Sequence, residues 1–283
     1  KELKSLNVRD ISQLSYFVPS MSIPAYGSRL TSSTYMRGIG SRSGNPAVGV
    51  YYDNIPLVNK SSFNSHFYEI DRIDVLRGPQ GTLYGVNTEG GLMRVYSKNP
   101  MNYQGTDMRL SLGTGLQSDV EIAHYHRPSD KFAFSTAAFY SGQKGFFDNT
   151  YLNKHADLSN EFGGKARLVW LPADGWNIDF TTDYQYVNQN GFPYGEYDSE
   201  TKHFSEPQTT LLNGYKRQMV NSGLHVTYRT PSLLLASTTS YQYLYDQMVM
   251  DQDYLPEDYL RLEQRQKMNA ITQELSLRST GDD

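Results

Sequence analysis

The stretch WNIDFTTDYQY, from Trp176 to Tyr186, places apolar or aromatic side chains at every second position, with Thr182 as the exception, and polar side chains between them. A period of two is the pattern of a β-strand, in which successive side chains point to opposite faces. One face here is aliphatic and aromatic and the other carries carboxylates and amides, which suits lipid on one side and a water-filled lumen on the other. The same register recurs at 107–112, 224–229 and 271–278, and less regularly at 132–140.

A soluble β-sandwich also has alternating strands, but two features favour a membrane barrel. The alternating segments run to about ten residues, the length that a tilted transmembrane strand needs, whereas sandwich strands average nearer five or six. Short turns also alternate with long loops, as in outer-membrane barrels, and we expect about eight antiparallel strands. The turns lie at 127–130, 172–175 and 230–232, and the loops at about 143–160, 188–213 and 246–266.

The composition agrees with this interpretation. The 283 residues are only 38% hydrophobic and carry a net charge of -4. Their apolar runs are far shorter than the roughly 20 residues of a spanning helix, which excludes a helical membrane protein. The 23 tyrosines suit strand ends at a membrane interface. The absence of cysteine excludes disulfides and thiolate metal sites.

The first hundred residues have a different character. They hold 11 Lys and Arg against 7 Asp and Glu, while the remainder is acidic. Short apolar strands are expected at 48–52, 73–76 and 92–96, between glycine-rich turns. We therefore predict a mixed α/β domain at 1–100 and barrel strands at 101–283.

The motif DRIDVLRGPQGTLYGVNTEGGLMRVYSK, at 71–98, resembles the end of the plug domain of TonB-dependent outer-membrane receptors. Val86 and Glu89 depart from the usual family pattern. Further plug-like motifs precede it in the family's order, and one barrel-strand motif follows it. They are LSYFVPSMSI (14–23), YMRGIGSR (35–42), VYYDNIPL (50–57) and TQELSLRST (272–280).

The resemblance implies a plug seated in a barrel of roughly 22 strands in the bacterial outer membrane. About eight strands cannot enclose such a plug. We therefore expect an incomplete barrel, the first part of a longer receptor, without the N-terminal coupling segment. The implied partners are outer-membrane lipid, the periplasmic TonB energy-coupling protein and a nutrient ligand. A surface lipoprotein is left open, and no nucleic acid is expected.

The implied function is TonB-dependent import of a scarce nutrient, with a ferric siderophore or similar iron chelate as the first choice. Vitamin B12, haem or a glycan stay open as cargo, and a soluble β-rich carbohydrate-binding module is the alternative from another class. We do not expect an enzyme, because Asp71 and Asp74 flank the apolar Ile73 in a strand rather than face each other in a cleft.

Two sets of site residues follow. The resemblance implies that Arg37 and Arg77 of the plug reach barrel carboxylates, with the inward-facing Glu274 as their partner. Ligand contacts are expected from rings and polar groups of the loops and plug apices, which could grip a bulky chelate. They are Phe63, His66, Phe192, Tyr194, Tyr197, Asp251, Asp253 and Tyr254.

Two further features bear on the ligand. The acidic segment 246–259 argues against a strongly anionic ligand, because like charges repel. His124 and His126 lie on one face of a strand, a spacing that can bind metal. The sequence offers them no evident third ligand, so we expect neither a metal site nor a cofactor.

Overall fold

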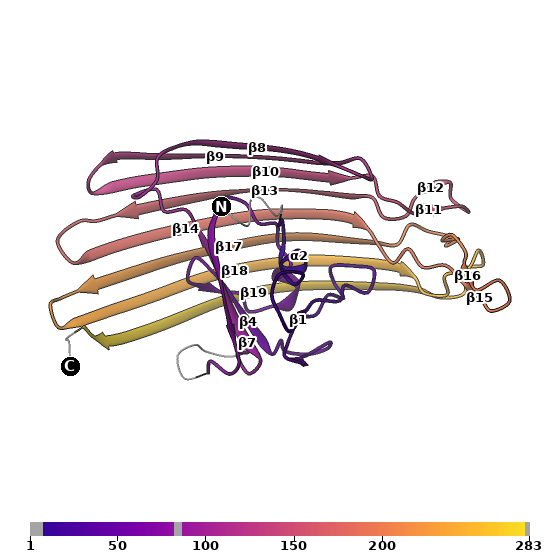
Figure 1. Cartoon of the computed structure of the whole chain (residues 1–283), viewed down its shortest axis with the longest axis horizontal. Coiled ribbons are helices and arrows are strands. Elements are labelled where there is room, and N and C mark those ends of the chain that lie inside the picture. Colours follow the sequence, from indigo (N-terminus) through magenta and orange to yellow (C-terminus); the bar gives the residue numbers. More distant parts are fainter. Residues whose placement is uncertain (1–7, 82–86, 281–283) are drawn as a thin grey trace.

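The computed structural model describes residues 8–81 and 87–280. The expected departure from the family pattern at Val86 lies outside these residues. Within them the chain forms two parts, a small N-terminal domain and a long curved sheet (Figure 1).

The large sheet has eight strands, each antiparallel to its neighbours and adjacent to them in chain order. This confirms the expectation of about eight strands, and the segment Trp176 to Tyr186 lies within one of them. The strands are β8 (Gly105–Gly113), β9 (Gln117–Ser129), β10 (Phe132–Gln143), β13 (Ser159–Trp170), β14 (Trp176–Asn190), β17 (Gly214–Arg229), β18 (Leu233–Asp251) and β19 (Arg261–Ser279). Among the described residues β8 and β19 do not pair, so the sheet is open.

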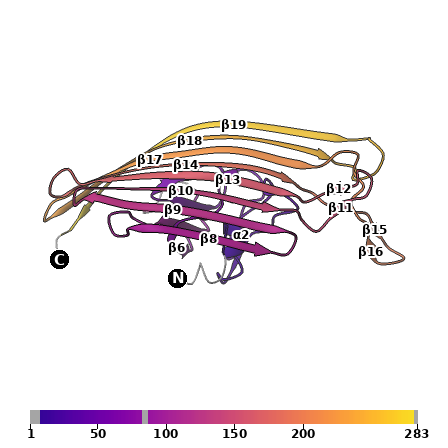
Figure 2. The same cartoon turned by 90° about the horizontal axis from the view of Figure 1, so that it is seen from above.

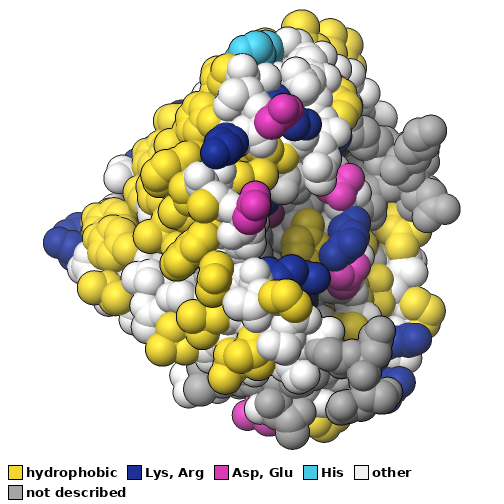
Figure 3. Space-filling model, turned by 90° about the vertical axis from the view of Figure 1, so that its left-hand side faces the viewer, with side chains coloured by type: hydrophobic (Ala, Val, Ile, Leu, Met, Phe, Trp, Pro, Cys, Tyr) yellow, Lys and Arg dark blue, Asp and Glu magenta, His cyan; other side chains and the backbone are white. Residues whose placement is uncertain are grey.

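The sheet curves around the N-terminal domain, which lies against its concave side (Figure 2). The register follows the predicted alternation, with Ile178 opposite Val226 and Asp179 opposite His225. Large side chains on the convex face are exposed, as at Leu110 and Ile271, whereas concave-face side chains of the central strands are buried, as at Gln185 and Leu244. Seen from the end with the short turns, hydrophobic side chains gather over the outer side and charged ones around a hollow (Figure 3).

The connections divide the sheet into two ends. Short turns join β9 to β10, β13 to β14 and β17 to β18 at one end. At the other end two long loops carry small hairpins, β11 (Asp148–Asn149) with β12 (Lys154–His155) and β15 (Tyr197–Asp198) with β16 (His203–Phe204). These hairpins extend beyond the strand ends (Figure 1).

The third long loop is shorter than expected. We predicted a loop at about 246–266, but β18 continues to Asp251 and β19 resumes at Arg261. The strands pair throughout this region, with Asp246 opposite Gln266. Asp246 and Asp251 therefore belong to a strand, whereas Asp253, Glu257 and Asp258 lie in the shorter connection at 252–260.

The N-terminal domain consists of two small sheets. β1 (Met21–Ser22), β2 (Tyr35–Met36) and β3 (Ile39–Gly40) form one. The other has the order β5 (Ile55–Pro56), β4 (Val48–Tyr52), β7 (Gly91–Ser97), β6 (Ile70–Arg77), with β4 parallel to β7. All three predicted strands are present here. The helical part is small: α2 (Ile11–Leu14), capped by the Asp10 side chain, and the 3₁₀ turn η1 (Lys60–Ser62).

A single apolar core joins the two small sheets to α2. Its most buried side chains come from every part of the domain, and β7 contributes two of them. They include Ile11, Met36, Val48, Met93 and Val95. The domain thus has its own core and meets the large sheet through other, mostly polar, residues.

No helix in the described ranges combines the length and the apolar character that crossing a bilayer requires.

Candidate functional site

The contact between the N-terminal domain and the large sheet centres on Lys165, an inward-facing residue of β13. Its ammonium pairs with the Asp53 carboxylate and lies 2.9 Å from Glu69 Oε1. All three side chains are almost inaccessible, at 1%, 3% and 1% exposure respectively. Asp53 directly follows β4 and Glu69 directly precedes β6, so one lysine of the large sheet binds two strand ends of the four-stranded sheet.

Arg167 extends this cluster by one inward position along β13. Its Nε and Nη2 donate to the two oxygens of Asp179, on β14, at 3.0 and 2.6 Å. Its Nη1 donates to Ser97 Oγ at 3.1 Å and lies 3.9 Å from Asp53. Burial alone would raise the pKa of the Asp53 carboxyl, but Lys165 and Arg167 outweigh it and hold that pKa below its ordinary value.

Nearer the long loops the signs are reversed, because here the N-terminal domain supplies the cations. Arg29 binds Glu161 of β13 through two contacts, one of them Nη1 to Oε2 at 2.8 Å. Arg9 Nε lies 3.2 Å from Asp119 Oδ2 of β9. Both carboxylates are buried.

Hydrogen bonds to backbone groups of the N-terminal domain complete the interface. Gln242 of β18 donates to the Pro56 carbonyl at 2.5 Å and accepts from the Val58 N–H at 3.2 Å. Arg217 of β17, which is 1% exposed, donates to the carbonyl oxygens of Ser61 and Asn64. The domain is therefore held by buried polar contacts along several strands.

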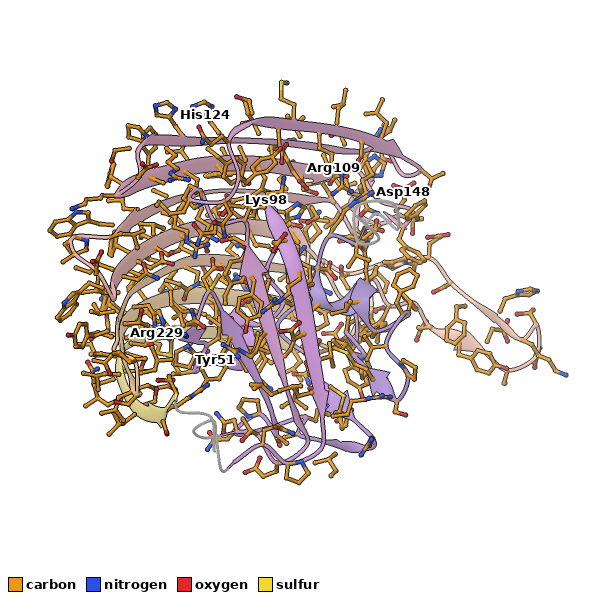
Figure 4. The ribbon with its side chains drawn as sticks, turned by 60° about the vertical axis from the view of Figure 1, so that its left-hand side comes forward. Tyr51, Lys98, Arg109, His124, Asp148 and Arg229 are labelled. Carbon is orange, nitrogen blue, oxygen red and sulfur yellow. The ribbon has the colours of Figure 1, made fainter. Side chains whose placement is uncertain are left out.

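The structure gives the predicted latch residue Glu274 a different partner. Its Oε1 accepts a hydrogen bond from Tyr51 at 2.7 Å. Figure 4 shows Tyr51 on the concave side of the sheet. Arg37 lies in the turn between β2 and β3 and Arg77 ends β6, both exposed, and no ion pair in the described ranges joins either to Glu274. The carboxylate of Glu274 is inward-facing as expected, but β19 approaches a tyrosine rather than the arginines.

Phe63 and His66 do not lie at an exposed apex. Phe63 packs in the core of the N-terminal domain. The His66 ring stacks on Phe139 of β10 at 4.2 Å, and its Nε2 lies 3.4 Å from Glu121. Both rings are buried, Phe63 in the core of the N-terminal domain and His66 at its contact with the large sheet.

Three of the predicted loop aromatics do come together. Tyr194 and Tyr254 meet edge to face at 5.2 Å, and Phe192 lies 6.4 Å from Tyr194. The Phe192 N–H donates to the Gly27 carbonyl at 2.7 Å, so this aromatic group sits directly on the N-terminal domain. Phe192 is buried, whereas Tyr194 is 40% exposed and presents a ring to the outside.

The other predicted loop residues have different roles. Asp251 is buried and accepts from the Thr210 N–H and Oγ1, both at 2.7 Å. Asp253 accepts backbone N–H groups of its own loop, including that of Leu255 at 3.0 Å. Tyr197 lies 5.0 Å from Phe204 across the projecting β15–β16 hairpin, away from the other rings. The two carboxylates thus shape loops rather than face outward.

Phe192 of this aromatic group also lines a cavity of about 530 Å³ between the N-terminal domain and the large sheet. One side is formed by residues 42–46 and 58–61 and includes Arg42 and Lys60. The other side is formed by inward positions of β18 and β19, including Met248 and Met250. The sequence reasoning missed these four residues. If the alternation with a period of two is continued through 246–251, it predicts that Met248 and Met250 both face inward.

His124 lies on the convex face, pointing away from the N-terminal domain (Figure 4). Its Nδ1 lies 2.9 Å from Thr106 Oγ1, and its ring is 6.3 Å from that of His126. In the described ranges no cluster of three or more His, Asp or Glu side chains is arranged to hold a metal ion.

A small domain held by buried ion pairs on the concave face of long alternating strands is the arrangement that is typical of one class of protein, the plugged outer-membrane β-barrels. Comparison with known proteins gives the family. Residues 1–92 match the family described as the TonB-dependent Receptor Plug Domain. The pesticin receptor of Yersinia pestis is 32% identical over 101 residues, which cover 35% of this chain and 15% of that receptor.

Two longer similarities extend beyond the plug. The vitamin B12 transporter BtuB of Vibrio vulnificus is 20% identical over 221 residues, covering 69% of this chain and 34% of the transporter. The crystal structure of the ferric yersiniabactin uptake receptor FyuA from Yersinia pestis aligns with a TM-score of 0.87 and 20% identity, covering 100% of this chain and 45% of that one. The chain thus spans less than half the length of the relatives it matches.

The N-terminal part of the chain thus matches the plug domain of TonB-dependent receptors, as its motifs predicted, and the eight strands that follow have the fold of the solved receptor structure that it resembles. From here on the N-terminal domain is called the plug and the large sheet the wall.

Proposed function

We propose that this chain is part of an active transporter that imports a ferric siderophore or a similar iron chelate across the bacterial outer membrane, driven by the periplasmic TonB protein. The solved structures that it resembles include uptake receptors for ferric yersiniabactin and for ferric catecholates. A ferrioxamine receptor of Yersinia enterocolitica is also related, at 23% identity over 143 residues.

The single observation that carries the proposal is the meeting of loop aromatics and plug beside a cavity. Phe192 lies beside Tyr194, donates to the Gly27 carbonyl of the plug and also lines the cavity, which is of the size that small-molecule sites have. A ligand there would touch wall, loops and plug at once, which is what coupling ligand binding to plug movement requires.

Tyr194 and Tyr254 are accordingly our first candidates for ligand contact, and the exposed Tyr197 is a candidate for first capture. Burial raises the pKa of both Tyr194 and Tyr254, so their hydroxyls stay protonated at neutral pH and can donate hydrogen bonds. The exposed Arg37 and Arg77 stay proposed as plug residues that reach barrel carboxylates.

Vitamin B12 is the second candidate cargo, because the similarity to a B12 transporter covers 69% of the chain. A soluble carbohydrate-binding module is disfavoured by the convex face, where large apolar side chains are exposed on neighbouring strands. Such a face suits lipid, and we place the protein in the outer membrane.

The test is growth and uptake in a strain that lacks the gene. With iron supplied only as a defined ferric chelate, the deletion strain should fail on at least one chelate that supports the parent strain. Uptake of that chelate, labelled with radioactive iron, should depend on both this protein and TonB. Loss of vitamin B12 uptake with unchanged use of every iron source would establish the second candidate instead.

A further inference from the structure

The cavity that Phe192 lines is unusual in its charge. Arg42 and Lys60 line it, and none of the described residues around it is acidic. Elsewhere between plug and wall, three cations face carboxylates, namely Arg9, Arg29 and Lys165. This cavity therefore has a positive charge that the surrounding described residues do not neutralise.

Both cations are fixed by the plug. The Lys60 Nζ donates to the Arg42 carbonyl at 2.7 Å, which ties η1 to the segment at 42–46. The Arg42 guanidinium lies over the Tyr26 ring, 4.6 Å from its centre. Within the part of the chain that the structure describes, neither side chain forms an ion pair with a carboxylate.

The electrostatic environment agrees with this geometry. Burial lowers the pKa of Lys60, and no carboxylate compensates it. Burial raises the pKa of Tyr194 while the Arg42 charge opposes that rise, so the guanidinium lies close enough to act on the Tyr194 hydroxyl. An anion entering here would offset the effect of burial on the Lys60 ammonium.

The carboxylates nearest this end of the wall are already engaged. Asp251 is bound to the Thr210 N–H and hydroxyl, and Asp246 accepts from the Tyr215 hydroxyl at 3.0 Å. Asp253 is occupied by backbone N–H groups of its loop. None of these carboxylates, nor Glu257 or Asp258, is among the residues that line the cavity.

The opposite side of the cavity is uncharged. Met248 and Met250 of β18 lie beside Phe192, and across the strand pair the wall continues with Leu262 and Gln264. Thioether and aromatic side chains form an adaptable apolar surface, and the amide adds a hydrogen-bonding group. The cavity thus has a cationic plug side and an apolar wall side.

We propose that the ligand of this cavity is an anionic ferric chelate, whose charged metal centre lies against Arg42 and Lys60 and whose apolar or aromatic part lies against Met248 and Met250. The inference rests on the proposed function and names the class of chelate. It reverses the expectation from the acidic segment, because the charge that a ligand meets is that of the plug.

The experiment measures binding to outer-membrane preparations from cells that express the protein. The probes are a ferric triscatecholate, which is anionic, and an uncharged ferric trishydroxamate. We expect the wild type to prefer the anionic probe. R42Q and K60Q should each weaken its binding by about tenfold, the value of one hydrogen bond to a charged group, and change binding of the neutral probe less than twofold.

Three controls separate charge from folding. R42K and K60R keep the charges and should retain the preference for the anionic probe. K202Q removes one positive charge from the exposed turn between β15 and β16 and should leave binding of both probes unchanged. Raising the salt concentration should weaken binding of the anionic probe more than that of the neutral one.

Two results would overturn the inference, and they differ in what else they imply. If the wild type prefers the uncharged chelate and R42Q and K60Q leave its iron uptake unchanged, the charge assignment is wrong but the proposed function stands. If neither probe binds and deletion leaves growth on every ferric chelate unaffected, the charge assignment and the proposed function are both wrong.

Discussion

Replacing Lys165 with methionine tests whether the buried cluster holds the plug. The substitution K165M keeps most of the side-chain volume but leaves Asp53 and Glu69 without the cation between them, at 3% and 1% exposure. Asp53 keeps the Ser97 N–H and hydroxyl at 2.8 and 2.7 Å, so the larger cost falls on Glu69. Breaking a buried pair by removing one partner costs about 3–5 kcal/mol.

A cost of about 4 kcal/mol raises the fraction of undocked plug roughly a thousandfold, since 1.4 kcal/mol is a factor of ten. Hydrogen exchange of the plug in outer-membrane preparations measures this directly. We expect faster exchange in 48–56 and 67–77, the segments that flank Asp53 and Glu69, because local opening becomes easier. Cells with K165M should also become more sensitive to large antibiotics that the outer membrane normally excludes.

A triple variant distinguishes unpaired charge from lost packing. K165M combined with D53N and E69Q removes all three charges and should restore most of the protection, because a buried ion pair and a neutral replacement are often similar in stability. K154M, on the exposed β12, is the matched control and should behave as wild type. Wild-type exchange in K165M, or a triple variant as unprotected as the single one, would refute this account of the cluster.

Three further predictions concern other parts of the molecule. Phe63→Ala removes a core ring of the plug and should destabilise it by about 3–5 kcal/mol, seen as faster hydrogen exchange, without changing chelate affinity in the folded fraction. Because the pKa of Asp53 is lowered in the folded state, the stability that its ionised carboxylate gives to the folded plug is complete at neutral pH and is lost as the pH falls below about 4. Protection of the plug against hydrogen exchange should decline in that range, and it should decline less in Asp53→Asn. Tyr194→Ala should weaken chelate binding several-fold, as titrated on outer-membrane preparations, whereas the same change at Tyr197 should leave equilibrium affinity unchanged, since Tyr197 packs against Phe204 on the projecting hairpin.

The strands and the plug could be predicted because their signals are local. Alternation over 176–186 is a property of eleven successive residues, and it holds in β14 because one face of that strand meets the plug and the other faces outward. The plug motifs likewise describe short strands and turns. A feature of this kind needs no knowledge of which distant segment packs against it.

The contacts between plug and wall could not be predicted in the same way. Lys165 and Asp53 are 112 residues apart in sequence, and their meeting depends on how deep the plug sits and how the strands are staggered. The resemblance supplied the type of contact, an arginine with a barrel carboxylate, but not the pairs. The structure instead shows Glu274 accepting a hydrogen bond from Tyr51.

Two of the candidate ligand residues form local contacts that depend on the backbone. Asp251, at the end of β18, accepts the Thr210 N–H, and Asp253 accepts N–H groups of its own loop, because backbone N–H groups in such segments require acceptors. Tyr194 and Tyr254 come from two different loops and their rings meet edge to face. These two tyrosines stay our proposed ligand contacts.

The order of charges along β13 gives the plug a defined position in the wall. The inward residues of this strand include Glu161 near the long loops, then Lys165 and Arg167 towards the short turns. In the plug, Arg29 pairs with Glu161, and Asp53 pairs with Lys165 and lies near Arg167. Glu161 and Lys165 are four residues apart, or about 13 Å along a strand. Moving the plug by that distance towards the turns would bring Arg29 opposite Lys165, and moving it the other way would bring Asp53 opposite Glu161. Either displacement replaces buried attraction by buried repulsion, so the sign change along one strand fixes both the depth and the orientation of the plug.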